Sequence, residues 1–203
     1  MGAMKMLRSM FVALVLALPA LPAAARELSL SEISAYLNSL VKVEAAFTQI
    51  NDDGTISTGR IYIWRPGRIR FEYDPPEESL VVAGRGQVAV FDARSNQPPE
   101  MFQLGLTPLS LILRSEIDLN RERMVVGFGS DGTTTTVVLQ DPEYPEYGNI
   151  RLIFTADPVQ LRQWVTTDSA GQTTTVILRD LKERRSFRLE LFDIEREAAR
   201  RGF

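Results

Sequence analysis

Residues 59–73 predict a β-hairpin, and they read Gly59-Arg-Ile-Tyr-Ile-Trp-Arg-Pro-Gly-Arg-Ile-Arg-Phe-Glu-Tyr73. Apolar and charged side chains alternate on both sides of the turn signal at Pro66-Gly67. Because successive side chains of a strand point to opposite faces, one face of this hairpin is apolar and faces a core. The inward-facing residues are Ile61, Ile63, Ile69 and Phe71. The solvent-facing side carries Arg60, Arg68, Arg70 and Glu72.

Arg65 is the exception to this alternation. Its place in the strand puts it on the inward face, directly before Pro66. One interpretation is that position 65 lies at the rim of the sheet, where a long side chain reaches water. The other is that the guanidinium lies inside, where it needs carbonyl partners because it carries five donors and cannot lose its charge. Helix ends would supply them, since the last carbonyls of a helix have no partner within it.

Further strands are predicted along most of the chain beyond Val43. Short runs rich in β-branched and aromatic residues alternate with turn signals. These signals are Asp52-Asp53-Gly54, Asp74-Pro75-Pro76, Gly84-Arg85-Gly86, Asp131-Gly132, Asp157-Pro158 and Ala170-Gly171. Roughly ten strands, mostly neighbours in sequence, predict a mainly β protein whose antiparallel sheet is large enough to curl into a barrel.

Two helical segments accompany the strands. Ser29-Leu-Ser-Glu32 is a capping box followed by apolar residues at helical spacing, which predicts an amphipathic helix over about 29–41. Thr107 as N-cap and Pro108 as first residue predict a short helix over 108–114. The second helix is apolar on nearly all sides, so it must be covered on most of them. It could plug the barrel end as ordinary core, or both helices could form a lid over an open sheet and its cavity.

The first 25 residues have the layout of a cleaved secretory signal peptide. Lys5 and Arg8 precede an apolar run over 10–18, and small residues follow as far as Ala25. The apolar run is too short to span a bilayer. We therefore expect residues 1–25 to be removed on export and residues 26–203 to form a single domain.

Composition excludes several classes of function. The net charge of the 203 residues is −3 at pH 7, and an acidic chain is a poor candidate for nucleic-acid binding. The chain contains neither Cys nor His, which removes disulfides, Ser-His-Asp catalysis and zinc sites built on imidazole or thiolate. A hydrolase would have to use carboxylates, but no pattern pairs two of them across a cleft. The available acids are Asp92, Asp118, Glu143 and Glu146. We therefore predict no enzymatic activity, cofactor or metal site.

Taken in order, several of these features resemble the LolA family of periplasmic outer-membrane lipoprotein carriers. The matching residues are Phe47-Thr48-Gln49, Gly59, Arg65-Pro66, Pro76-Glu77, Val81-Val82-Ala83-Gly84-Arg85 and Thr107-Pro108. The resemblance covers essentially all of residues 26–203. It implies an incomplete, unclosed antiparallel β-barrel covered by a lid of short α-helices, located in the periplasm, whose apolar interior receives the acyl chains of lipoproteins.

The resemblance also implies roles for individual residues and partners. Arg65 matches the arginine that latches the lid, and it would bond the lid at Leu37, Ile112 and Leu113. The residues expected to form the lid and the hydrophobic cavity are Leu37, Leu40, Phe47, Ile61, Ile63, Ile69, Phe71, Leu109, Ile112 and Leu113. The implied partners are acylated lipoproteins as cargo, an inner-membrane ABC transporter similar to LolCDE and an outer-membrane receptor similar to LolB. The chain is expected to act as a monomer.

Some features depart from the family pattern, and two other functions stay open. Trp64 stands where a charged residue is common in the family, Ala89 stands where an aromatic residue is frequent, and the tail beyond Phe192 is short and charged. A periplasmic carrier of another lipid, such as a phospholipid or glycolipid, would use the same cavity. A structural β-domain would instead have a filled barrel without a cavity.

Overall fold

The computed structural model describes residues 26–121 and 123–203, so the expected signal peptide lies outside the described residues. The strands are β1 (Lys42–Asn51), β2 (Ile56–Trp64), β3 (Arg68–Tyr73), β4 (Leu80–Gly84), β5 (Gln87–Phe91), β6 (Glu100–Gln103), β7 (Val125–Ser130), β8 (Thr135–Gln140), β9 (Asn149–Ala156), β10 (Val159–Thr167) and β11 (Thr173–Glu183). The α-helices are α1 (Leu30–Ser39) and α2 (Ile194–Arg200). Short 3-10 helices are η1 (Leu104–Leu106), η2 (Pro108–Leu111), η3 (Pro145–Tyr147) and η4 (Leu189–Phe192).

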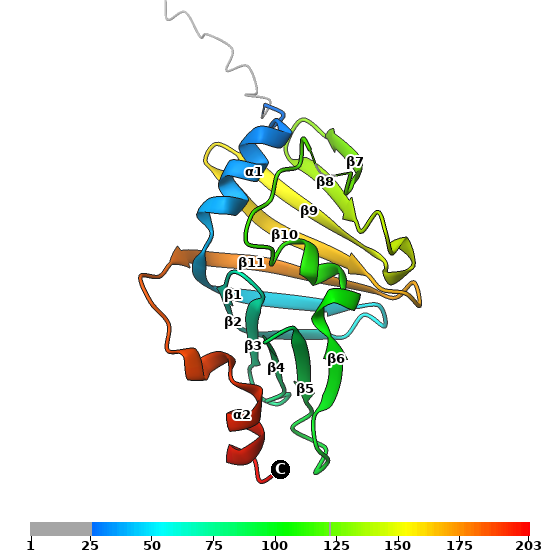
Figure 1. The fold of residues 1–203 in the computed structure, drawn as a ribbon. Helices are drawn as coiled ribbons and strands as arrows, with labels where there is room; N and C mark the ends of the chain where they lie inside the picture. Colours follow the sequence, from blue (N-terminus) through cyan, green and yellow to red (C-terminus); the bar gives the residue numbers. More distant parts are fainter. Residues whose placement is uncertain (1–25, 122) are drawn as a thin grey trace, which may run out of the picture.

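All eleven strands form one antiparallel sheet in the order β6-β5-β4-β3-β2-β1-β11-β10-β9-β8-β7 (Figure 1). Most neighbours in the sheet are neighbours in sequence, and among the described strands β1 with β11 is the one long-range pairing. β6 and β7 are the two ends of the sheet and do not pair with each other within the described chain. The curved sheet is therefore an unclosed barrel, which confirms the predicted fold class.

Helix α1 begins at the predicted capping box. The backbone N–H of Glu32 donates to the Ser29 hydroxyl at 3.2 Å, and the N–H of Ser29 donates to the Glu32 carboxylate at 2.9 Å. The apolar side of the helix, with Ile33 and Leu37, is buried in the core cluster inside the sheet. In Figure 1, α1 lies across the part of the sheet that contains β8, β9 and β10. This helix thus covers one half of the barrel interior.

The hairpin of residues 59–73 is folded as the alternation predicts. Ile61 pairs with Phe71, and Ile63 pairs with Ile69. The ring of Phe71 lies edge-on to those of Phe47 and Trp164, with centroid separations of 5.4 and 6.4 Å. The aromatic rings therefore join strands on both sides of the β1–β11 pairing into one core.

Two β-bulges change which side chains face the interior. In β10 an extra residue, Arg162, follows Leu161 and shifts the register against β9. As a result Leu161 and Trp164 both point inward, and Trp164 is fully buried. In β11 the register shifts opposite Ala45, and Asp180 adopts a positive φ of 53°. Because the bulge adds one residue to β11, the side chain of Leu181 points inward where plain alternation would point it outward, and it packs against the core.

The second predicted helix is shorter than expected and of a different type. It is a 3-10 helix over Pro108–Leu111, not an α-helix over 108–114. Pro108 is its first residue as predicted, but the Thr107 side chain caps no backbone N–H and instead donates to the Leu104 carbonyl at 2.8 Å. Beyond this helix, the carbonyl groups of residues 113–115 accept from the Gly67 N–H and the Arg65 guanidinium.

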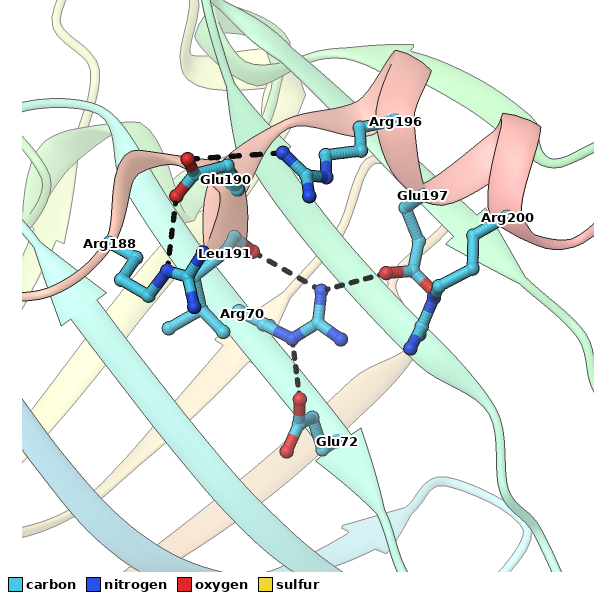
Figure 2. Close-up of a pocket in the computed structure, with 8 residues that line it drawn as sticks. All are labelled: Arg70, Glu72, Arg188, Glu190, Leu191, Arg196, Glu197 and Arg200. Atoms are coloured by element: carbon cyan, nitrogen blue, oxygen red, sulfur yellow. Dashed lines mark hydrogen bonds and ion pairs between the residues drawn. The ribbon is translucent and has the colours of Figure 1, made fainter.

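The prediction that Arg70 faces solvent is wrong. Arg70 lies on the outer face of β3, but the C-terminal segment, residues 187–203, covers it and leaves it 6% exposed. Its guanidinium bonds the Glu72 carboxylate at 2.6 Å, the Leu191 carbonyl at 3.2 Å and the Glu197 carboxylate at 3.4 Å (Figure 2). Arg70 therefore joins the sheet to both η4 and α2.

The same segment covers an apolar strip on the outer face of β4 and β5. The strip is formed by Leu80, Val82, Ala89 and Phe91, and Ile194 and Ala198 of α2 pack on it. Trp64 contacts Phe192 of η4, with ring centroids 6.0 Å apart. Both departures from the family pattern, Trp64 and Ala89, thus lie under the C-terminal segment. The small side chain of Ala89 leaves room for α2.

The Glu197 carboxylate is the main polar anchor of α2, and its replacement should release the helix. Besides Arg70, it accepts from Arg200 at 2.6 Å and from Arg201 at 2.9 Å. We expect Glu197→Gln to lower the free energy of unfolding by about 1 to 3 kcal/mol, because the charge-assisted bonds to Arg70, Arg200 and Arg201 are weakened while Arg70 keeps its pair with Glu72. Urea unfolding and trypsin cleavage within residues 187–203 measure this.

The matched control is Glu195→Gln, which changes a carboxylate that is 88% exposed on the same helix. We expect this variant to unfold and resist trypsin like the wild type. Equal trypsin cleavage of the two variants would mean that the apolar strip alone holds α2 in place.

Candidate functional site

The lid consists of α1 and of residues 104–121, which we call the strap. A small pocket of about 30 Å³ lies between this lid and the sheet. The lid side is formed by Leu37, Leu40, Ile112 and Leu113, and the sheet side by Val43, Ile63, Leu161, Trp164, Leu178 and Leu181. The volume is that of about one water molecule. The expected cavity is therefore nearly filled when the lid is closed, and a long apolar ligand would have to displace the lid.

Arg65 lies between the sheet and the lid at this pocket, and it is only 6% exposed. Its Nε donates to the Arg114 carbonyl at 2.8 Å, and Nη1 donates to the Leu37 carbonyl. Its Nη2 donates to the Asn38 side-chain oxygen at 3.1 Å and to the Ser115 carbonyl at 3.4 Å. The interpretation that position 65 is a solvated rim position is therefore wrong.

Among the described residues, the hydrogen-bond partners of the Arg65 guanidinium are backbone carbonyls and the Asn38 amide, which are dipoles without net charge. Burial lowers the pKa of the guanidinium, but an arginine side chain keeps its proton in proteins. The Leu37 carbonyl belongs to the last turn of α1, where the helix dipole favours a cation. Hydrogen bonds to a charged group contribute about 1.5–3 kcal/mol each. The side chain can thus hold both parts of the lid against the sheet without a carboxylate.

The strap residues that Arg65 bonds are not those that the family resemblance implied. The implied residues were Ile112 and Leu113, whereas the structure has Arg114 and Ser115. The Leu113 carbonyl instead accepts from the N–H of Gly67 at 2.8 Å. The difference follows from the short 3-10 helix, because the strap turns away from helical geometry before residue 114. Ile112 and Leu113 direct their side chains into the pocket.

The other predicted cavity residues divide into two groups. Leu37, Leu40, Ile63, Ile112 and Leu113 line the pocket. Phe47, Ile61, Ile69 and Phe71 are buried in the core but do not line it, and Leu109 is partly buried against the same core. The second group would contact a ligand only if the space between lid and sheet became deeper.

Sequence reasoning missed several pocket residues. Trp164 and Leu161 lie three positions apart, so plain alternation cannot place both on one face. The bulge at Arg162 brings them together, and an interrupted alternation in 159–165 is the only sequence signal for it. Asn38 was also missed, because a polar residue near a helix end reads as solvent-facing.

No helix among the described residues is long and apolar enough to cross a membrane. No group of three or more acidic side chains there is arranged to hold a metal ion.

Comparison with known proteins gives a consistent picture. A family model described as "Outer membrane lipoprotein carrier protein LolA" matches residues 38–195. An outer-membrane lipoprotein carrier protein of Nitrosomonas europaea is 27% identical over 198 residues, covering 92% of this chain and 94% of that protein. One from Pseudomonas aeruginosa is 24% identical over 194 residues, covering 88% and 89%.

One solved structure shares the fold at a TM-score of 0.50. It is a putative outer membrane lipoprotein-sorting protein domain from Vibrio parahaemolyticus, 8% identical, with 82% of this chain and 95% of that chain covered. At this identity the likeness concerns the fold alone.

Proposed function

Because the chain belongs to the LolA family of outer-membrane lipoprotein carrier proteins, we propose that it carries lipoproteins across the periplasm by enclosing their acyl chains between the lid and the sheet. It would receive them from an inner-membrane ABC transporter similar to LolCDE. It would deliver them to an outer-membrane receptor similar to LolB. The protein would act as a monomeric chaperone without catalytic activity or cofactor.

The proposal is supported most directly by an apolar pocket under the lid and by a buried arginine of the sheet that hydrogen-bonds the lid. The wall of the pocket is apolar except for one buried cation, and the donors of that cation go to the lid. A cation that bonds backbone carbonyls and an amide can release them and bond them again, whereas a packed apolar core alone has no such reversible contact. Arg65 would thus close the lid without cargo and give way to incoming chains.

The energetics favour a carrier that depends on partners. Moving an acyl chain of about 16 carbons from a bilayer into water costs about 12 kcal/mol, at ~0.8 kcal/mol per CH₂. Three chains would cost about 36 kcal/mol, whereas non-covalent binding saturates near ~20 kcal/mol. For a triply acylated cargo, the interior can offset only part of the extraction. An energised transporter has to supply the rest, and the receptor has to offer a more favourable apolar site.

Depletion of the protein in its own cell tests the proposal. We expect acylated lipoproteins to accumulate in the inner membrane, as measured by fractionation and immunoblotting. Re-expression of the wild-type chain should restore their outer-membrane location. Unchanged sorting after depletion would exclude the carrier role.

Mass spectrometry of gently purified protein separates the proposed cargo from other lipids. Bound acylated lipoprotein is the expected result. Phospholipid or glycolipid alone would favour a carrier of that lipid. If no lipid were bound and no hydrophobic fluorophore such as ANS bound either, the filled structural domain would be the better description.

A further inference from the structure

Asn38, in the last turn of α1, uses both ends of its side-chain amide. Its Nδ2 donates to the Ile117 carbonyl at 2.8 Å, and its Oδ1 accepts from the Ile117 N–H at 3.0 Å. The same oxygen accepts from Arg65 at 3.1 Å. A flipped amide would place its NH₂ against two donors, so the network fixes the orientation. Asn38 therefore binds one strap residue as a neighbouring β-strand would, and holds the latch arginine as well.

Ser34, one turn earlier, continues this pairing. Its hydroxyl oxygen accepts from the Leu119 N–H at 3.0 Å, and its O–H donates to the Leu30 carbonyl at 2.7 Å. Four residues of helix rise about 6.0 Å, and two residues of extended chain span about 6.6 Å, so the two spacings match. The strap thus runs antiparallel to α1, with Ile117 opposite Asn38 and Leu119 opposite Ser34.

The backbone groups in this pairing have no easy alternative partners. Ile117 and Leu119 are buried in the apolar core, where an unpaired N–H or carbonyl is costly. If α1 and the strap separated during opening, these groups would lose their partners. If both parts moved together, the bonds broken would be those between lid and sheet, such as the bonds of Arg65 and the Leu161 N–H to the Tyr36 hydroxyl at 3.1 Å.

We propose that Asn38 is a positioning residue that, with Ser34, joins α1 to the strap so that the lid opens as one body. The inference rests on the proposed function only in treating these elements as a lid that opens. It places the route of the acyl chains between the lid and the sheet, past Leu37 and Ile112, and not between α1 and the strap. Arg65 bonds both parts from the sheet side and so acts on a single moving unit.

Amide hydrogen exchange, followed by NMR on residues 26–203 without lipid, tests this inference. The N–H of Gly67 bonds the strap from the sheet and reports lid opening, whereas the N–H groups of Ile117 and Leu119 report separation of the strap from α1. In Arg65→Leu we expect Gly67 to exchange about tenfold faster or more, since all four hydrogen bonds of the guanidinium to the lid are lost. Ile117 and Leu119 should stay within about threefold of the wild type.

Substitutions of Asn38 and Ser34 should instead speed exchange at Ile117 and Leu119. Asn38→Leu should speed exchange at Ile117 about tenfold or more, and Ser34→Ala should do the same at Leu119. Asn38→Asp keeps the acceptor for Ile117 and Arg65, so it should restore part of the protection, which a purely structural role would not. If Asn38→Leu does not fold, exchange in Ser34→Ala and Asn38→Asp still tests whether these side chains join α1 to the strap. The control is Asn51→Leu, whose side-chain amide bonds Gln49 and Thr55 of the β1–β2 hairpin, away from α1 and the strap.

One result overturns the inference. If Arg65→Leu speeds exchange at Ile117 and Leu119 as much as at Gly67, α1 and the strap separate on opening and Asn38 does not join them. Because no lipid is present, this result is independent of the cargo. Failure of the carrier role would appear only in the depletion and lipid-binding experiments.

Discussion

Arg65→Leu should fold and bind acyl chains but pass them on at least about tenfold more slowly than the wild type, the equivalent of about 1.4 kcal/mol. The variant removes a buried charge and adds an apolar side chain of smaller volume, so the core inside the sheet is retained. It also removes the donors that re-close the lid on the Leu37 and Arg114 carbonyls. Without this competing set of bonds, closure of the lid no longer helps to displace the bound chains, and the acceptor alone has to draw them out.

A transfer assay in two steps measures the effect. The protein is first loaded with a triacylated lipoprotein and then mixed with an acceptor, and each step is timed separately. Arg65→Lys should fall between the wild type and Arg65→Leu, because it keeps the charge but loses the planar fork. Arg68→Leu removes an arginine from the same hairpin that lies outside, over the Trp64 ring, and should transfer normally. Wild-type transfer by Arg65→Leu would exclude the latch role.

Ile63→Glu should abolish acyl binding. Ile63 is partly buried and lines the pocket from the sheet side, so a carboxylate there would lie among apolar side chains beside Arg65. The expected loss in the free energy of unfolding is about 2 to 4 kcal/mol, with part of the cost avoided by protonation. Phe71→Glu, deeper in the same core, should reduce the yield of folded protein further.

The control for Ile63→Glu is the same substitution at Ile56, which is 66% exposed on the same strand. Binding of a fluorescent acyl probe and urea unfolding are measured on both variants. Ile56→Glu should behave like the wild type in both. Normal probe binding by Ile63→Glu would show that the acyl chains do not contact this wall.

The parts of the fold that were predicted from sequence are those set by local rules. The capping box at Ser29 determines where α1 begins, and the alternation in 59–73 determines which side of the hairpin faces the core. The inward position of Arg65 followed from the same alternation, but its burial did not, since a strand end can be either solvated or covered. Its lid contacts came from the family resemblance, and two of the three were displaced along the strap.

The parts that were not predicted depend on contacts between distant residues. The bulge at Arg162 is stabilised by the register of β10 against β9, and only that register brings Trp164 into the pocket. Asn38 binds Ile117, 79 positions away, so its role cannot be read from α1 alone. Arg70 has the pattern of a solvated strand residue, and only the packing of residues 187–203 on the outer face buries it.

The two buried arginines differ in how their contacts respond to acid. Arg65 bonds neutral carbonyls and an amide, none of which titrates, so these bonds do not depend on the protonation of their acceptors. Arg70 bonds Glu197, and the pKa of that carboxyl is lowered from its ordinary value of 4.5. Burial would raise this pKa, but the hydrogen bonds from Arg200 and Arg201 and the charge of Arg70 outweigh it. Stability from a carboxylate of this kind is present above pH 4.5 and is lost as the pH falls through the lower folded value. Acid would therefore loosen the C-terminal segment while the hydrogen bonds of Arg65 to α1 and the strap persist.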